Sequence, residues 1–431
     1  MAGPLRKERR RTPYAIRDDG GVKRRKHRPD YLLLIFSLAL LVVGLIVVYS
    51  ISPALGARFN VGDSYFAGRQ IISIFIGLVA FLGASLVPID KWRKLGIPLL
   101  IVGGLATIVT LFLPVSSEYP APRWIRIGGL SLQSVEIVKL AFIVWLASFI
   151  EKRIDYKQVG LFNKPFRPAI AVSGVFMVVV ALIQSDFGSA AVLAAIMGSM
   201  FFVAGLPMRE VLQAGLIVGV VAVLFILPFG YRRDRLNTFL NPEADCVNTG
   251  YQACQAFIAV GSGGIAGRGL ASSGQAYGYL PEAANDSIFA IIAEKFGFIG
   301  SSLVVVLITA FFVRIKNIME RAPDEFTRLM ATGVLAWLSL QTFINIGAMI
   351  GLLPLKGITL PLISYGGTSV VFVMAAVGLV FNISRYTSYA VNRGEGPKSG
   401  SNSYREGKRN ENIAVRRRDR RTHQSATGRR S

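Results

Sequence analysis

Residues Tyr31 to Ser52 read YLLLIFSLALLVVGLIVVYSIS and contain no charged side chain. About 20 apolar residues are what a helix needs to cross the hydrocarbon core of a bilayer. The stretch is too long for a cleavable signal peptide, and many similar blocks follow it. The sequence therefore predicts an all-α integral membrane protein, a bundle of ten transmembrane helices. The other nine predicted spans lie near 70–88, 97–114, 134–150, 168–184, 189–206, 211–229, 287–313, 329–353 and 366–384.

The positive charge of the chain is concentrated outside these blocks. Of 48 Lys and Arg residues, 11 lie in residues 1–29 and 13 lie from Arg385 onward. An even number of spans places both tails on one side, and the positive-inside rule makes that side the cytoplasm. We therefore predict a basic cytoplasmic tail at 1–29, a membrane domain at 30–388 and a disordered basic cytoplasmic tail at 389–431.

The basic runs Lys23–Arg28 and Arg416–Arg421 could suggest nucleic-acid binding. The tails contain few aromatic residues and belong to no module that could read bases. Basic segments beside a membrane more often set topology and contact anionic lipid headgroups. We therefore expect membrane lipids, and no nucleic acid, as partners of the tails.

A long external loop, residues 230–286, is predicted between spans seven and eight. Loops of that length in compact proteins usually carry function or are disordered. The stretch Tyr251–Val260 is apolar enough for a short helix at the membrane edge, and the glycine-rich run Gly261–Gly269 follows it. The glycines either permit a tight bend or expose backbone N–H groups to a phosphate. Cys246 and Cys254 lie in the same loop, where a disulfide is an open alternative to two free thiols.

Four motifs carry a resemblance to a known family. They are QSDFGSA (Gln184–Ala190), RWIRIGGLSLQSVEIVKL (Arg123–Leu140), YLPEAANDSIFAIIAEKFG (Tyr279–Gly297) and GLLPLKGITLPLISYGGTS (Gly351–Ser369). With these motifs in family order and ten predicted spans, the chain resembles the SEDS family, the shape, elongation, division and sporulation proteins. The Leu280–Ala283 segment and the long basic tail are more similar to the division branch than to the elongation branch.

The resemblance implies a peptidoglycan glycosyltransferase that joins lipid II units into glycan strands at the outer face of the bacterial cytoplasmic membrane, at the division septum. It also implies a class B penicillin-binding protein and other division proteins as partners. Asp286 matches the catalytic aspartate of the family and suits a general base for the acceptor hydroxyl. The alternative from the residues alone is a helix cap, with Asn285 or Asp286 capping a helix that begins at Ser287.

Substrate binding is predicted for Glu282, the nearest second carboxylate, and for external cations that would stabilise the departing lipid diphosphate. For any single arginine, a solvated loop surface is the competing interpretation. No cofactor is required by the residues, and the one to consider is a divalent cation, Mg²⁺ or Mn²⁺, with Asp286 or Glu282 as a ligand. The predicted substrate-binding cations are Arg123, Arg126, Arg232, Arg235 and Lys356.

Three ionisable residues fall inside the predicted spans: Glu136, Lys139 and Asp186. Such groups are costly in a membrane and normally pair inside the bundle, and the i,i+3 spacing of Glu136 and Lys139 allows direct contact. We predict a buried polar network, with the lining of a substrate cavity as the alternative. Intramembrane charges and helix breaks would also suit a lipid II flippase, and a non-catalytic division scaffold is a third possibility.

Overall fold

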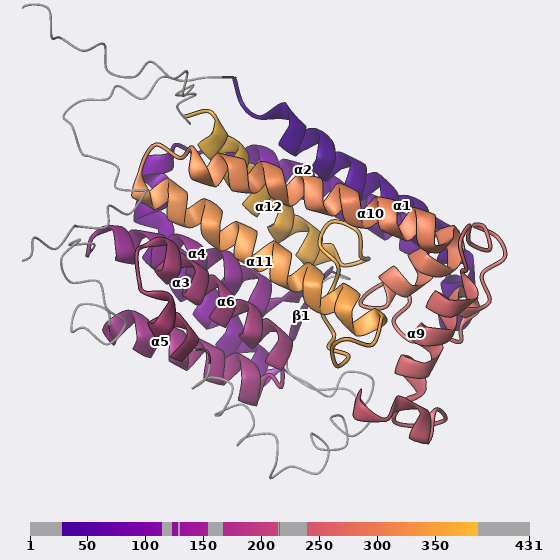
Figure 1. Ribbon diagram of the computed structural model, residues 1–431. Coiled ribbons are helices and arrows are strands. Elements are labelled where there is room, and N and C mark those ends of the chain that lie inside the picture. Colours follow the sequence, from indigo (N-terminus) through magenta and orange to yellow (C-terminus); the bar gives the residue numbers. More distant parts are fainter. Residues whose placement is uncertain are drawn as a thin grey trace, which may run out of the picture. The chain divides into compact units, whose positions relative to one another are not determined.

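The computed structural model describes residues 28–113, 123–127, 130–153, 167–213, 215 and 239–386. Helices dominate this part of the chain (Figure 1). Six of them are long and apolar enough to cross a membrane by themselves. These six are α1 (Tyr31–Phe59), α2 (Tyr65–Leu86), α3 (Ile89–Phe112), α10 (Ile288–Glu320), α11 (Glu325–Met349) and α12 (Gly367–Ser384).

Three further helices occupy predicted spans. They are α4 (Ser134–Glu151), which carries three charged residues, α5 (Arg167–Val178), which continues into the π-helix η1 (Val179–Ile183), and α6 (Phe187–Val203). Nine of the ten predicted spans thus coincide with helices in the described residues. The tenth, 211–229, lies outside them except for its first residues, as do both tails apart from residues next to the helices.

Small residues let the helices approach closely. The helices α2 and α12 pack along each other, and a Cβ atom at Gly378 would lie 2.4 Å from the backbone oxygen of Phe81. Lipid tails are as apolar as the helix surfaces, so no hydrophobic force drives helices together within a bilayer. Close van der Waals contact therefore contributes much of what holds a membrane bundle together. Gly378→Ala would therefore push α12 away from α2.

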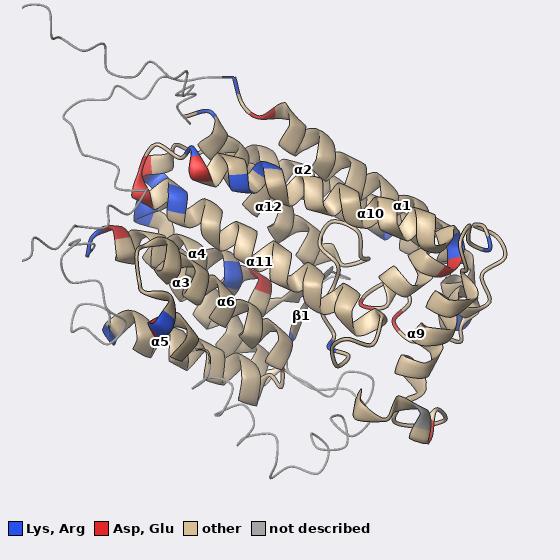
Figure 2. Cartoon of the chain, in the orientation of Figure 1, with Lys and Arg blue, Asp and Glu red and all other residues tan. Residues whose placement is uncertain are grey.

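Most charged residues lie at the ends of the helices, and a blue and a red segment also lie together in the middle of the bundle (Figure 2). At one end, Arg93 of α3 contacts Glu151 at the end of α4 and Asp324 before α11, both at 2.9 Å. Arg314 of α10 pairs with Asp30 before α1. The N-terminal ends of α1, α3 and α11 therefore lie beside the C-terminal ends of α4 and α10. This is the antiparallel arrangement that the predicted topology requires.

The segments predicted to be external carry more structure than the sequence indicated. An antiparallel hairpin, β1 (Trp124–Ile127) and β2 (Leu130–Gln133), precedes α4, and its register pairs Ile127 with Leu130. The predicted loop contains η2 (Pro242–Asp245), α9 (Tyr251–Ser262) and η3 (Gln275–Tyr277). The expected short helix at Tyr251–Val260 is confirmed as α9, and a disulfide joins Cys246 to Cys254.

Candidate active site

Asp286 lies in the turn before α10, where three contacts from other segments hold its backbone. The Asn345 side-chain amide of α11 donates to the Asp286 carbonyl at 2.7 Å. The Ser364 hydroxyl donates to the carbonyl of Asn285 at 2.6 Å, and the backbone N–H of Tyr365 donates to the carbonyl of Ala284 at 2.8 Å. The position of the Asp286 carboxyl group is therefore set by α11 and by the segment that precedes α12.

The capping interpretation of this aspartate is wrong. The helix α10 begins at Ile288, with Ser287 at the N-cap position and no side-chain cap hydrogen bond. The Asp286 side chain is only 8% exposed, and its Oδ1 atom has no hydrogen-bond partner among the described residues. A buried carboxyl oxygen without a hydrogen-bond partner is unfavourable, so Asp286 lowers the stability of the folded protein.

Burial raises the pKa of Asp286 to about 8, and the negative charge of Glu282 adds to this effect. Hydrogen bonding from nearby backbone groups and from the Gln252 side chain opposes it. A general base works best when its pKa lies near the operating pH. The environment of Asp286 therefore suits proton transfer better than that of an ordinary surface carboxylate.

Glu282 lies on the same turn and is exposed. Its backbone has a φ of 51°, in the left-handed region that non-glycine residues rarely adopt. The Asn285 side-chain amide donates to the Glu282 carboxylate, and the Ser287 N–H donates to the Glu282 carbonyl at 3.1 Å. These contacts hold a strained residue beside Asp286, as sites that orient a substrate often do.

Lys356 lies on the loop that passes Asp286. A Cβ atom at the next residue, Gly357, would lie 3.9 Å from Asp286 Oδ2. The Lys356 ammonium group lies 5.6 Å from the ring centroid of Phe187, the first residue of α6. Three of the four motifs thus meet here, and this predicted cation is brought to the neighbourhood of the carboxyl group.

Arg123 contacts the beginning of the same motif that supplies Phe187. It donates to the carbonyl oxygens of Gln184 and Ser185, both at 2.7 Å, where the chain passes from η1 to α6. The buried Gln184 amide in turn donates to the hydroxyls of Thr110 and Ser134. Arg123 therefore stabilises the chain between η1 and α6. The side chain of Arg126, together with Arg232 and Arg235, lies outside the described residues.

The predicted contact between Glu136 and Lys139 is confirmed. The Lys139 ammonium group donates to Glu136 at 2.7 Å and to the side-chain oxygen of Gln341 at 3.0 Å. It also lies 4.7 Å from the ring centroid of Trp337. Glu136 is 3% exposed and Lys139 is 2% exposed, so this is a network inside the bundle.

Asp186 takes a separate role. Its carboxylate caps α6, accepting from the N–H of Ser189 at 3.0 Å and from the Ser189 hydroxyl at 2.8 Å. Within the described part of the chain, no hydrogen bond joins its side chain to Glu136 or Lys139. Asp186 is buried as predicted but stabilises the start of one helix.

The network around Lys139 continues to the loop beside Asp286. Gln341 donates to the carbonyl of Thr359 at 2.9 Å, and Asn345, one turn further along α11, donates to the carbonyl of Ile358 at 2.7 Å. Neither amide was predicted as a site residue. Two amides four residues apart in an otherwise apolar block were the available signal, because such groups seek partners inside a bundle.

The glycine-rich run before α10 is explained by close packing. A Cβ atom at Gly263 would lie 2.0 Å from the Ala293 carbonyl oxygen, and one at Gly267 would lie 2.2 Å from the Lys295 carbonyl oxygen. Gly267 also has a φ of 84°. The chain after α9 therefore folds against the first turns of α10, which accounts for these glycines without a phosphate.

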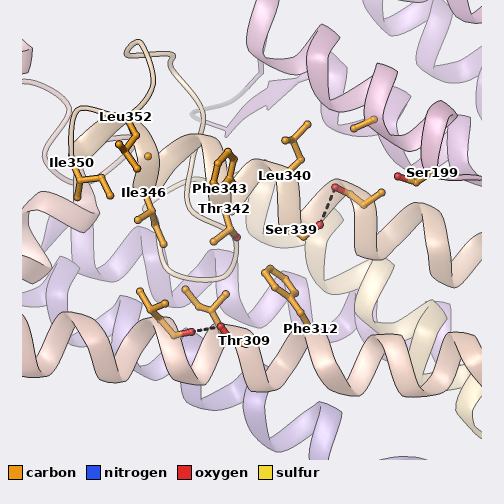
Figure 3. A pocket seen from close by; sticks show the side chains of 15 residues that line it. Ser199, Thr309, Phe312, Ser339, Leu340, Thr342, Phe343, Ile346, Ile350 and Leu352 are labelled. Carbon is orange, nitrogen blue, oxygen red and sulfur yellow. Dashed lines mark hydrogen bonds between the residues drawn. The ribbon is translucent and has the colours of Figure 1, made fainter. Parts of the chain in front are cut away.

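An apolar groove of about 600 Å³ opens between α6, α10 and α11. Figure 3 shows Thr309 and Phe312 of α10 facing Thr342 and Phe343 of α11 across it. The groove extends to Leu352, on the loop that continues to Gly357 beside Asp286.

The sequence of the chain is similar to known proteins over most of its length. A family model described as "Cell cycle protein", covering FtsW, RodA and SpoVE proteins, matches residues 31–389. Stage V sporulation protein E of Bacillus subtilis is 37% identical over 85% of this chain and 99% of its own. A probable peptidoglycan glycosyltransferase FtsW of Geobacter metallireducens is 34% identical over 83% of this chain and 95% of its own. The similarity to the family is confirmed, and the relatives include FtsW proteins as well as a sporulation protein.

Solved structures share the fold. A chain from a peptidoglycan synthase complex, described as structural coordination of polymerization and crosslinking, aligns with a TM-score of 0.68 at 25% identity, over 84% of this chain and 99% of its own. The rod shape determining protein RodA of Thermus thermophilus aligns with a TM-score of 0.60 at 23% identity, over 84% of this chain and 98% of its own. The match over residues 31–389 agrees with the four motifs, and the chain belongs to the SEDS family of multi-pass membrane proteins.

Proposed function

We propose that this chain is a peptidoglycan glycosyltransferase that polymerises lipid II, with Asp286 as the general base. One observation carries the assignment: a buried carboxyl group with a pKa of about 8 lies in a turn that α11 and the segment before α12 hold in place. Relatives named as probable peptidoglycan glycosyltransferases support the reaction type.

In the proposed reaction, ionised Asp286 takes the proton from a hydroxyl of the acceptor sugar. That oxygen bonds to the anomeric carbon of the donor sugar, and the bond from this carbon to the lipid diphosphate breaks. The diphosphate leaves with the bonding electron pair, so positive charge placed beside it lowers the barrier. Lys356 is the candidate cation, because the next residue, Gly357, lies beside the Asp286 carboxyl group. Glu282 is placed to orient a sugar.

The groove between α10 and α11 suits the isoprenoid chain of such a substrate. Its lining is mainly aliphatic and aromatic, with a few hydroxyl groups from Ser199, Thr309 and Ser339. A lipid chain that enters sideways from the bilayer would bring its diphosphate toward Leu352 and the Asp286 turn. The catalytic step can then take place at the membrane surface while the chain stays in an apolar medium.

The partner and location of the protein follow from the same assignment. A neighbour in fold is part of a complex that couples polymerization to crosslinking. We therefore propose a class B penicillin-binding protein as partner, with other division proteins, at the septum. In this arrangement both tails are cytoplasmic and the Asp286 turn faces outward.

A divalent cation is the one cofactor to test. The described residues contain no group of three or more His, Cys, Asp or Glu side chains that could hold a metal ion. Mg²⁺ needs only one or two protein carboxylates when substrate phosphates supply the other oxygens. The unpartnered Oδ1 atom of Asp286 fits that description. Polymerisation measured with EDTA, and again after Mg²⁺ or Mn²⁺ is added, tests this proposal.

The central test is Asp286→Asn in a polymerisation assay with purified protein, partner and lipid II. Asparagine keeps the shape of the side chain but cannot accept the proton, so we expect a loss of about 10²–10⁴-fold. The same change at Asp63, which is exposed between α1 and α2, is the control and should leave the rate near that of the parent.

The assay also separates the other candidate functions. A flippase would give no polymer from either protein but measurable translocation of lipid II across vesicles. A scaffold would show neither activity and would support division in the Asp286→Asn form. Polymer of normal length and rate from Asp286→Asn would overturn the assignment of the general base.

A further inference from the structure

One side chain of α11, Asn345, contacts both segments that carry the candidate reacting groups. Its amide nitrogen donates to the carbonyl of Asp286 and to the carbonyl of Ile358, both at 2.7 Å. Asp286 is the candidate general base, and Ile358 lies two residues after Lys356, the candidate cation. A side-chain amide has two N–H groups, so each carbonyl receives one of them. A single amide group therefore joins the segment of the base to the segment of the cation.

The surroundings of this amide allow it one orientation. Asn345 is 2% exposed, and its side-chain oxygen has no hydrogen-bond partner among the described residues. Turning the amide over would place that oxygen against two carbonyl oxygens and would leave both of them without their donor. An unsatisfied buried oxygen is unfavourable, and here it accompanies the two donated bonds. The contribution of the Asn345 side chain to this site is therefore the pair of bonds to the carbonyls.

The two carbonyls lie close to the groups that the reaction needs. A Cβ atom at Gly357, between Lys356 and Ile358, would lie 3.9 Å from Asp286 Oδ2. The bond to the next carbonyl, that of Ile358, holds this part of the loop beside the carboxyl group. The rate of a reaction that uses two groups at once depends on their separation, and a misplacement of about 1 Å can lower it about 10²-fold.

Other contacts between the same segments end at neighbouring residues. The Ser364 hydroxyl donates to the carbonyl of Asn285 at 2.6 Å and accepts from the N–H of Leu360 at 2.7 Å. These bonds fix the turn one residue before Asp286. Asn345, in contrast, donates to the backbone of Asp286 itself, and it does so from a helix that belongs to neither segment.

We propose that Asn345 is a positioning residue that sets the separation of Asp286 and Lys356 during polymerisation. This inference rests on the proposed function, because both groups are assigned through that reaction. The Asn345 side chain is buried, so it acts through the two backbone segments and has no contact with the substrate. Loss of the amide should lower kcat and leave KM near that of the parent, since the misplaced groups act in the transition state.

The test is the steady-state kinetics of polymerisation by the complex with its partner, at one pH and several lipid II concentrations. Asn345→Leu replaces the amide by an apolar group of similar size and should lower kcat by about 10²-fold. Asn345→Ser keeps one hydroxyl donor, so its kcat should lie between those of the parent and Asn345→Leu. An unchanged kcat in Asn345→Leu, or a loss that appears only in KM, would overturn the proposal.

The matched control is Thr332→Val, also on α11. Thr332 is 4% exposed, and its hydroxyl donates to the carbonyl of Arg328 within the same helix at 2.8 Å. The change removes a buried polar group of α11 without altering either segment, so kcat and KM should stay near those of the parent. Thermal unfolding in detergent shows which variants are folded. If Thr332→Val lost as much kcat as Asn345→Leu, or if neither Asn345 variant folded, the role of Asn345 would be structural and the proposal would fail.

A double-mutant cycle tests whether Asn345 acts through the cation. Lys356→Met removes the charge and keeps most of the side chain. Added to Lys356→Met, the change Asn345→Leu should cost less than the loss of about 10²-fold expected in the parent, because one of the two positioned groups is already missing. Losses that multiply in full would show that Asn345 does not position Lys356 and would overturn the proposed coupling.

The outcomes also distinguish this inference from the proposed function. If Asp286→Asn polymerises normally, the assignment of the general base fails, and the positioning role fails with it. If Asp286→Asn is inactive but Asn345→Leu keeps the kcat of the parent, only the positioning role is overturned.

Discussion

At the scale of a single residue, Asp286 combines burial, a missing hydrogen bond and a nearby negative charge. The folded protein binds a proton at this carboxyl group up to a pH of about 8, whereas an aspartate in the unfolded chain has a pKa near 3.8. The folded state therefore binds more protons between these values. Stability is lost progressively as the pH rises from about 4 to 8.

Asp286→Asn should remove this loss and stabilise the protein at neutral pH. With 1.36 kcal/mol per pH unit, the gain at pH 7 is on the order of 4 kcal/mol. Thermal unfolding of both proteins in detergent, at several pH values, measures the difference. It should shrink toward zero near pH 4, and an Asn variant that unfolds at a lower temperature than the parent at pH 7 would contradict the burial of an uncharged acid.

The charge on Glu282 gives a second prediction at this scale. Since Glu282 helps to raise the pKa of Asp286, Glu282→Gln should lower that pKa. The acidic limb of the polymerisation profile should then move to lower pH. The rate at high pH reports separately on any role of Glu282 in sugar binding. A limb that does not move would mean that solvent screens the two carboxyl groups from each other.

At the scale of an element, the pair on α4 shows how a charge is kept inside a membrane bundle. Lys139→Met leaves Glu136 buried without its partner, which typically costs about 3–5 kcal/mol. The double variant Glu136→Gln/Lys139→Met removes both charges and should recover most of the loss. Denaturant unfolding in mixed micelles measures both.

The matched control is the exposed pair of Lys316 and Glu320 on α10, whose side chains are 58% and 39% exposed. Lys316→Met should change stability by about 0.5 kcal/mol or less, because solvent screens such pairs. Equal losses from Lys139→Met and Lys316→Met would show that the α4 pair is hydrated in the bilayer.

How far the sequence predicts an element depends on what specifies it. Apolar blocks specify helices, so nine predicted spans coincide with α1 to α6 and α10 to α12 in the described chain. The hairpin β1–β2 was missed, because its strands are four residues long and lie in a segment that reads as a Pro- and Gly-rich loop. The contact between Glu136 and Lys139 was predictable because it is local, with an i,i+3 spacing.

Contacts between distant segments were not predictable in the same way. Asn345 and Ser364 reach the Asp286 turn from 59 and 79 residues away in the chain. The supposed cap at Asp286 failed for a related reason, since tertiary contacts from α11 fix the turn and Ser287 becomes the N-cap. Likewise Arg123, predicted to bind substrate, has its contacts at the break before α6.

At the scale of the whole molecule, the testable property is the orientation in the membrane. Tags at Arg10 and Arg420 should be reachable only from the cytoplasm. A single cysteine at Ser272, which is exposed, should react with an impermeant thiol reagent from outside. A cysteine at the neighbouring Ser273, which is 0% exposed, should react only after denaturation. Labelling of either tail from outside would overturn the ten-span arrangement.

The protonated state of Asp286 has a consequence for inhibitor chemistry. A carboxyl group with a pKa of about 8 presents an O–H donor to a molecule that arrives at pH 7. A basic amine, the usual partner for an aspartate, would first have to draw that proton away. Neutral compounds with a strong hydrogen-bond acceptor, attached to an apolar tail that fills the groove lined by Phe312 and Phe343, match the resting enzyme better. Their affinity should fall as the medium becomes alkaline, whereas that of an amine should rise until the amine itself loses its charge.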